Sequence, residues 1–145
     1  MANLAGFLKP TYLERTAELV ISDRFVDENG EPLKFIMKSM PQAKLQSILK
    51  NATKEARAKA GKGKAGSDID EAVQNRITAV CIVESCVQPD FKQTDICEAY
   101  GTVDPYQVPE RMLNAGEYKK LSDMFLNLNE LNDDTIADLM AVTKN

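Results

Sequence analysis

Few residues in this chain could do chemistry, and their types exclude most catalytic arrangements. The 145 residues contain no His and three cysteines, Cys81, Cys86 and Cys97. Without His, neither a Ser-His nor a Cys-His nucleophile pair can be built. The absence of His strongly disfavours catalysis. It does not exclude catalysis, because Asp, Glu and Lys can still act as acids and bases. The sequence therefore predicts a protein that works by binding another protein, with no enzymatic activity and no cofactor.

The cysteines do not form a metal-site pattern. A structural zinc site takes four N or S ligands, and only three thiols are present. On one helix, the five-residue spacing from Cys81 to Cys86 turns the second thiol by about 500°, onto a different face. An odd number of cysteines in apolar surroundings also argues against a disulfide framework. We expect reduced, buried thiols, as in a cytosolic protein.

Charge is distributed unevenly along the chain. Residues 41–66 carry seven cations against one anion, whereas residues 84–145 carry twelve anions against five cations. The basic segment, Lys44–Lys64, could contact phosphate, but it has no aromatic residue on which a base could stack. A solvated helix end is the favoured interpretation, and a small nucleic-acid-binding regulator stays open as an alternative. The acidic half lacks the dense spacing of a calcium loop, which favours simple surface solvation.

The glycines near residue 63 do not complete a phosphate-binding loop. Gly61 and Gly66 have P-loop spacing, but Ser67 stands where that motif needs Lys. Three glycines in six residues without an apolar anchor instead predict a mobile loop near 60–67.

The elements that hold these residues begin with a β-hairpin over 18–38. Apolar and polar residues alternate on both sides of Asn29-Gly30, a pair that tolerates the positive φ of a tight turn. The return strand is expected to place Leu33, Phe35 and Met37 on one face. Two strands alone are marginally stable, so the hairpin must pack on helices or on another chain.

Helices are expected in the rest of the chain. Apolar stripes at spacings of three and four predict one from Pro41 to about Lys59 and a central core helix that Ser67 caps and that runs to about Val87. A shorter helix at Thr94–Tyr100 and a turn with a short helix through Leu113 follow. Residues 114–116 read as a break before the next helix.

The last predicted helix starts at Glu117 and has a marked apolar stripe. A weaker stripe continues in the tail, where a ten-residue helix would be marginal alone and must dock or stay disordered. An amphipathic helix can hold a partner in a groove, so these stripes are the candidate partner-binding surface. Its residues are Tyr118, Leu121, Phe125, Leu128, Ile136, Leu139 and Met140.

Together these patterns predict an α+β fold that is mostly helical, with an N-terminal β-hairpin followed by four or five helices. Residues 1–132 are expected to form one domain, and residues 133–145 a short C-terminal helix or flexible tail. No run of 18 apolar residues occurs, and the start of the chain lacks the features of a signal peptide.

A series of short motifs resembles the XkdN-like family of phage tail assembly chaperones. That family shows a "YG…DP" element, then "ML.PGEY", then a closing "ELN". The matching residues here are Ile96-Cys97-Glu98-Ala99-Tyr100-Gly101, Asp104-Pro105, Met112-Leu113-Asn114-Ala115-Gly116-Glu117-Tyr118 and Leu128-Asn129-Glu130-Leu131-Asn132. The order and spacing carry the resemblance, which is weaker at Asn3-Leu4, Phe7-Leu8 and 35–38. Ala115 replaces the family's Pro, and Asp133-Asp134 replaces a frequent Gly-Phe.

The resemblance implies a role in the cytoplasm of a bacterial host. Such chaperones of phages or prophages are thought to coat the tape measure protein until tail tube subunits replace them, without catalysis. Weak binding by many copies suits that role, so self-association through the hairpin edge or the C-terminal helix is expected. A structural tail or neck protein retained in the virion remains an alternative.

Overall fold

The computed structural model describes residues 4–8, 15–60 and 66–131. A three-stranded antiparallel sheet, in the order β1-β2-β3, is formed by β1 (Thr16–Leu19), β2 (Phe35–Lys38) and β3 (Cys86–Gln88). The predicted α+β class is confirmed. The helices are α1 (Leu4–Leu8), α2 (Gln42–Ala60), α3 (Gly66–Ser85), α4 (Thr94–Ala99), the 3-10 helix η1 (Pro105–Gln107), α5 (Val108–Met112) and α6 (Ala115–Leu128).

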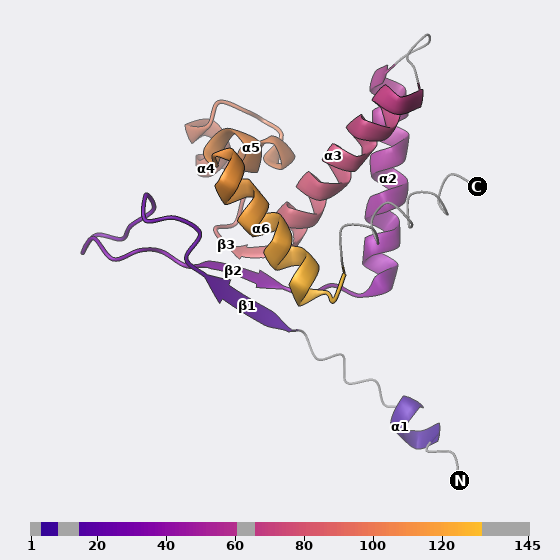
Figure 1. Cartoon of the computed structure of the whole chain (residues 1–145), viewed down its shortest axis with the longest axis horizontal. Helices are drawn as coiled ribbons and strands as arrows, with labels where there is room; N and C mark the ends of the chain where they lie inside the picture. The colour runs from indigo at the N-terminus through magenta and orange to yellow at the C-terminus, as the bar shows by residue number, and fades with distance from the viewer. Residues whose placement is uncertain (1–3, 9–14, 61–65, 132–145) are drawn as a thin grey trace.

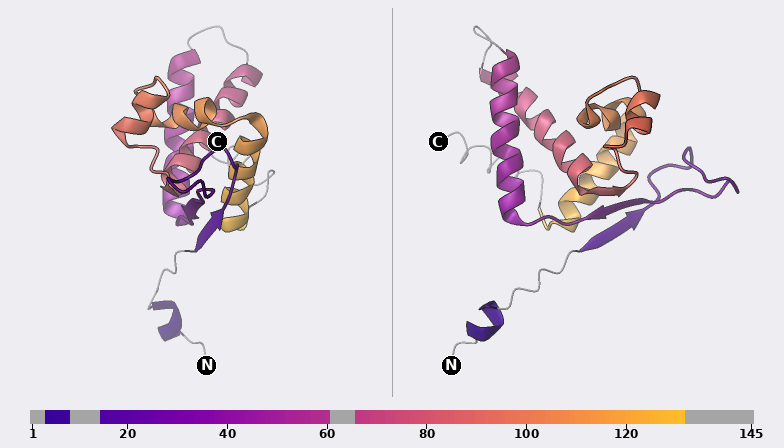
Figure 2. Two further views of the ribbon diagram at one scale, coloured as in Figure 1. Left: turned by 90° about the vertical axis from the view of Figure 1, so that its left-hand side faces the viewer. Right: turned by 180° about the vertical axis from the view of Figure 1, so that it is seen from behind.

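The hairpin is longer and less regular than the alternation in the sequence predicts. Leu19 pairs with Phe35, so residues 20–34 form an arm that projects beyond the sheet (Figures 1 and 2). Gly30 adopts a φ of 79°, as the Asn29-Gly30 turn requires. Phe35 and Met37 are buried as predicted, but Leu33 lies on the arm with 41% of its surface exposed. That part of the prediction was wrong because regular pairing begins only at Phe35.

The third strand replaces the predicted last turn of the central helix. The helix was expected to reach Val87, but α3 ends at Ser85 and the chain extends along β2. Pro89 disfavours a helical conformation at the residue before it, and pairing with β2 supplies the hydrogen bonds that the helix loses. Val87 is consequently half exposed instead of buried.

Two helix starts also differ from the sequence prediction. The helix α3 begins at Gly66, which places Ser67 inside its first turn and not at the N-cap. The helix α6 begins at Ala115 and not at Glu117, so residues 114–116 are not a break. Asn114 caps α6. Its side-chain oxygen accepts a hydrogen bond from the backbone N–H of Glu117 at 2.9 Å, and its backbone N–H donates to the Glu117 carboxylate at 3.0 Å.

The helices α2 and α3 lie side by side and rise from one end of the sheet, while α6 packs against α3 and the strands (Figure 1). The core lies where these elements meet, around Phe35, Met37, Leu49, Ile77 and Leu121. Cys81, Cys86 and Cys97 belong to it and are free thiols, which confirms the expected burial.

A polar network lies on the side of α3 that faces α2 and η1. The Arg76 guanidinium pairs with Asp104 at 3.0 Å and Glu55 at 2.9 Å, and its carbon lies 4.8 Å from the Tyr106 ring centre. The Tyr106 hydroxyl donates to Glu84 at 2.7 Å. These contacts tie α2, α3 and η1 together, so this side of α3 is occupied.

Candidate partner-binding groove

The helix α6 carries four of the seven candidate residues, and the structure divides them into two kinds. Leu121 and Phe125 are buried in the core, whereas Tyr118 and Leu128 are half-buried at its margin. Leu121 and Phe125 therefore help to hold α6 in place, while Tyr118 and Leu128 keep part of their surface exposed. Ile136, Leu139 and Met140 lie outside the described residues.

The N-terminal end of α6 is fixed by an ion pair to the hairpin. The Arg24 guanidinium donates to both carboxylate oxygens of Glu117 and, at 3.1 Å, to the Met112 carbonyl. The Glu117 side chain is only 8% exposed. Hydrogen bonds from Arg24 above all, then from Ser22 and the Asn114 amide, lower the pKa of Glu117 to about 2. Glu117 is thus ionised at neutral pH and links the hairpin arm to α6.

The C-terminal end of α6 is fixed as well. The Asn129 side chain accepts from the Met40 amide at 3.0 Å, just before α2 begins. The Leu131 amide donates back to the Leu126 carbonyl at 2.7 Å, with Glu130 at a φ of 58°. This reversal is the left-handed helix ending that satisfies the last carbonyl groups.

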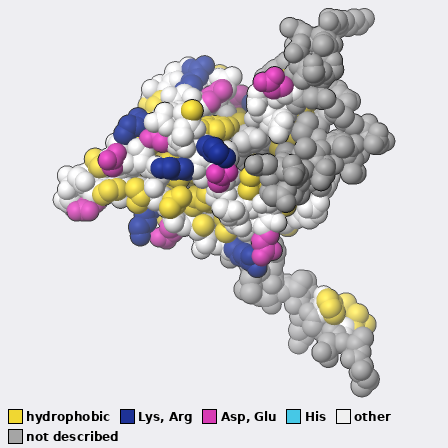
Figure 3. Space-filling model, in the orientation of Figure 1, with side chains coloured by type: hydrophobic (Ala, Val, Ile, Leu, Met, Phe, Trp, Pro, Cys, Tyr) yellow, Lys and Arg dark blue, Asp and Glu magenta, His cyan; other side chains and the backbone are white. Residues whose placement is uncertain are grey.

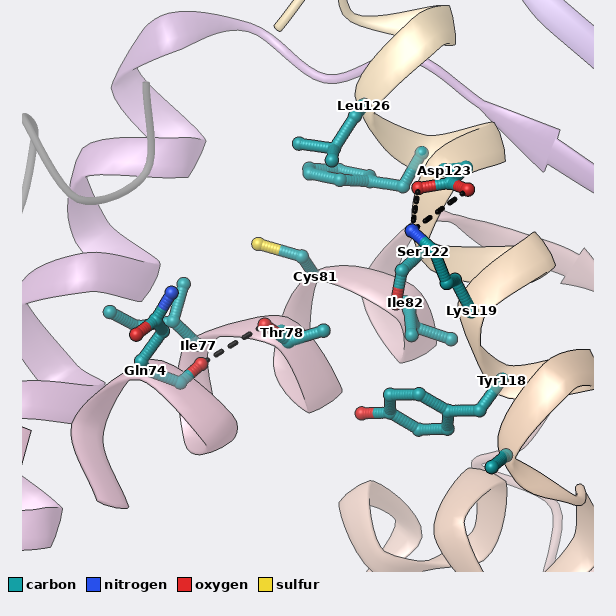
Figure 4. A pocket seen from close by; sticks show the side chains of 12 residues that line it. Gln74, Ile77, Thr78, Cys81, Ile82, Tyr118, Lys119, Ser122, Asp123 and Leu126 are labelled. Atoms are coloured by element: carbon teal, nitrogen blue, oxygen red, sulfur yellow. Dashed lines mark hydrogen bonds and ion pairs between the residues drawn. The ribbon is translucent and has the colours of Figure 1, made fainter. Parts of the chain in front are cut away.

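Between these fixed ends, α6 leaves a groove of about 310 Å³ against α3. Figure 4 shows the side chains from the two helices that surround it. Its apolar lining is formed by six side chains from the two helices: Ile77, Cys81, Ile82, Tyr118, Phe125 and Leu126. Polar side chains stand at its rim: Gln74, Thr78, Lys119, Ser122 and Asp123.

The lining of the groove is apolar and chemically inert. Burial, followed by the nearby Glu84 charge, raises the pKa of the Cys81 thiol to about 12. Burial also raises the pKa of the Tyr118 hydroxyl to about 12. At the rim, Lys119 contacts Asp123 at 3.4 Å in an exposed pair that a ligand can open at little cost. An apolar lining with a polar rim fits one face of an amphipathic helix.

The sequence pattern identified one wall of this groove and missed the other. Tyr118 and Phe125 belong to the predicted stripe, whereas Thr78 and Ser122 at the rim were not predicted. Ile77 and Cys81 were expected only as core residues. Amphipathic periodicity shows that each helix has an apolar face, but it does not show that α3 and α6 diverge enough to leave part of both faces open.

Other kinds of site have less support in the described part of the chain. Residues 4–8, 15–60 and 66–131 contain no group of three acidic or thiol side chains that could hold a metal ion. No helix among these same residues is long and apolar enough to cross a membrane. In the basic segment, Lys44 contacts Glu84 at 3.5 Å, and Lys50 and Lys54 are exposed on α2; its other cations lie where side chains are not described.

Comparisons with known proteins show the family to which the chain is related. The family model for phage XkdN-like tail assembly chaperones matches residues 4–141. The phage-like element PBSX protein XkdN of Bacillus subtilis (strain 168) is 35% identical over 126 residues, which cover 86% of this chain and 81% of that protein. The protein YqbN of the same strain is 34% identical over 129 residues, covering 88% of this chain and 83% of that one.

A solved structure shows the same fold. The crystal structure of a protein named YqbN matches with a TM-score of 0.70 at 28% identity, covering 91% of this chain and 99% of that one. With a family model that spans nearly the whole chain, the resemblance carried by residues 96–132 is confirmed. The chain belongs to the family of phage XkdN-like tail assembly chaperones.

Proposed function

We propose that this chaperone binds an apolar helical segment of the tape measure protein in the cytoplasm of the bacterial host, without catalysing a reaction. Family membership gives the general role, which is tail assembly. The groove between α3 and α6 is the observation that carries the finer proposal, because it offers an open apolar lining beside α6, whose two ends are fixed.

The binding surface would combine the groove with its extension along α6. Tyr118 lines the groove and Leu128 lies half-buried further along the same helix. Ile136, Leu139 and Met140 follow in the sequence and would add a second apolar stripe to the contact. Leu121 acts indirectly, since it holds α6 against the core, whereas Phe125 is buried in the core and also lines the groove.

The size of the groove fits a reversible contact. Its volume lies at the lower end of the range of about 300–1,000 Å³ that small-ligand cavities occupy. A single site of this size binds an apolar segment weakly, so tight coverage of a long partner requires many copies. Weak individual contacts also let tail tube subunits displace the chaperone.

Co-expression with a tape measure protein of the same phage or prophage, followed by affinity capture, tests this proposal. The wild-type chain should co-purify with the tape measure protein and increase its soluble fraction. Leu126→Asp, in the groove, and the double substitution Ile136→Asp with Leu139→Asp should each reduce capture by at least tenfold, about 1.4 kcal/mol. The tail double substitution should leave the free energy of unfolding nearly unchanged.

The matched control is Val103→Asp, which places the same charge at a fully exposed apolar residue that does not line the groove. Its capture should equal that of the wild type. Absence of the tape measure protein from the wild-type eluate, with no gain in its solubility, would contradict the proposal. Mass spectrometry of finished particles should detect no copies of the chain, and its presence there would favour a structural tail protein.

A further inference from the structure

The described part of the chain ends beside the groove. Leu126 lines the groove, and its carbonyl accepts a hydrogen bond from the Leu131 amide at 2.7 Å. Between these two residues, Glu130 has a φ of 58°, in the left-handed region that reverses the chain after a helix. The Glu130 carboxylate also lies 2.6 Å from the Arg15 guanidinium, which holds this turn to the start of β1. A segment that follows Leu131 therefore starts at one end of the groove, with its direction reversed relative to α6.

The length of chain after Leu131 suffices to cover the groove. On α6 the lining runs from Ala115 to Leu126, which corresponds to about 17 Å at the rise of an α-helix. Fourteen residues follow Leu131. As a helix they would span about 21 Å. This segment can therefore reach the far end of the groove without unfolding any part of α6.

The apolar stripe of this segment is complementary to the groove. In a helix, Ile136, Leu139 and Met140 share one face, because they are spaced by three and four residues. Asp134 and Asp138 fall on the opposite face, since each lies two residues from Ile136 and is turned by about 200°. Docking through the stripe would remove two apolar surfaces from water and leave both carboxylates in it.

We propose that residues 132–145 dock in the α3–α6 groove of their own chain and occupy it until a partner segment replaces them. The segment runs antiparallel to α6, with Ile136 near Leu126 and Thr143 near Lys119. Figure 4 shows the two helices that receive it, and Figure 3 shows apolar side chains open between charged ones on the face of the molecule seen in Figure 1. Replacement by the tape measure protein rests on the proposed function, whereas docking does not. The displaced stripe is then free to contact the partner.

The chain's own segment is the occupant because it is attached at the end of the groove. Attachment over a short distance gives an effective concentration on the order of millimolar, well above that of free segments at micromolar protein. Three apolar side chains make a small contact, so the docked segment exchanges rapidly and adds little to the free energy of unfolding. A partner with a longer apolar face can therefore displace it.

Disulfide trapping in the full chain tests this proposal. Lys119→Cys with Thr143→Cys places one thiol at the groove rim and the other one turn beyond Leu139 and Met140. The matched control is Lys120→Cys with Thr143→Cys, because Lys120 is exposed on α6 and does not line the groove. With oxidised glutathione as the oxidant, the first pair should close an intramolecular disulfide at least tenfold faster than the control pair. Mass spectrometry of proteolytic peptides measures both rates.

Two further comparisons establish what the trapped contact depends on. Adding Ile136→Asp and Leu139→Asp to the first pair should slow closure to the rate of the control pair, because the apolar stripe is lost. Tenfold dilution should leave the rate unchanged, because both thiols belong to one chain. Circular dichroism and thermal unfolding of the reduced variants should match the wild type, which shows that they are folded.

Three results would overturn the docking. The first is an equal rate for the two cysteine pairs, and the second is a rate that the two Asp substitutions leave unchanged. The third is a rate that falls in proportion to dilution, because the docked segment would then belong to another copy.

The oxidised first pair also separates this docking from the proposed function. If both hold, the closed disulfide should block capture of the tape measure protein, and dithiothreitol should restore it. Selective closure without any loss of capture would support the docking and contradict binding of the tape measure protein in the groove. Equal closure rates, together with capture that Leu126→Asp abolishes, would contradict only the docking.

Discussion

The ends of α6 and its middle are built in opposite ways. At the ends, charged and polar side chains make direct hydrogen bonds to distant parts of the chain, Arg24 to Glu117 and the Met40 amide to Asn129. In the middle, α6 meets α3 through apolar side chains that leave a groove open. The ends, together with the core side chains Leu121 and Phe125, fix the position of the helix, while the described residues leave the groove side of its middle open.

The largest expected effect comes from removing core support beneath the groove. Leu121 is fully buried, and Leu121→Ala should lower the free energy of unfolding by about 2–5 kcal/mol through lost burial and a residual cavity. Leu126→Ala removes the same atoms from a half-buried position in the groove and should cost less than half as much. Urea unfolding measures both, and equal losses would show that the groove is part of the rigid core.

The fixed N-terminal end should make stability depend on pH. Because the folded pKa of Glu117 is about 2, below its ordinary value of 4.5, the native state binds fewer protons than the unfolded state. The stabilisation is fully present above about pH 4.5 and is lost as the pH falls toward 2. Glu117→Gln should therefore be less stable than the wild type at pH 7, and the difference should shrink with acidification.

Unfolding curves at a series of pH values measure this difference. Asp123→Asn at the groove rim is the control, because within residues 4–8, 15–60 and 66–131 its carboxylate contacts Lys119 alone, in an exposed pair. A constant gap between Glu117→Gln and the wild type from pH 7 to pH 3 would contradict the assignment.

Thiol labelling should show that the groove lining stays closed to reagents. Cys81 lines the groove, yet it is only 1% exposed and its pKa is raised to about 12. At pH 8 its thiolate fraction is on the order of 10⁻⁴. Iodoacetamide should react with Cys81 only at the rate of unfolding. Burial also raises the pKa of the Cys86 thiol to about 12, so Cys86 should react equally slowly. Rapid labelling of Cys81 alone in the folded protein would indicate that the groove opens widely enough to expose its lining.

The smallest expected effect concerns the rim. Lys119 and Asp123 form an exposed pair four residues apart, and such pairs stabilise a helix by about 0.3–0.5 kcal/mol. Lys119→Ala should therefore change the unfolding free energy by no more than this amount. A loss comparable to that of Leu121→Ala would show that the rim, like the helix ends, supports the fold.

The sequence was sufficient for features governed by local periodicity. The stripe through Leu121 and Phe125 predicted the face that α6 buries, and Phe35 and Met37 were placed correctly on β2. Features governed by competition between local and distant partners were missed. Cys86 and Val87 fit a helix locally, and their pairing with β2 depends on a strand fifty residues earlier.

The groove was beyond sequence prediction for a related reason. Apolar periodicity cannot distinguish Leu121, which is sealed, from Tyr118 one turn earlier, which is half open. That distinction depends on how α6 is seated against α3, which local periodicity does not specify. The sequence alone indicated that Glu117 is an ordinary surface charge, because its partner Arg24 lies 93 residues away in the chain.

The small volume of the groove has a consequence for counting. A groove of about 310 Å³ holds one short apolar segment, so the number of copies that cover a long partner is not encoded in the chaperone. The length of the covered polypeptide would determine how many copies assemble, and a shortened tape measure protein should recruit proportionally fewer.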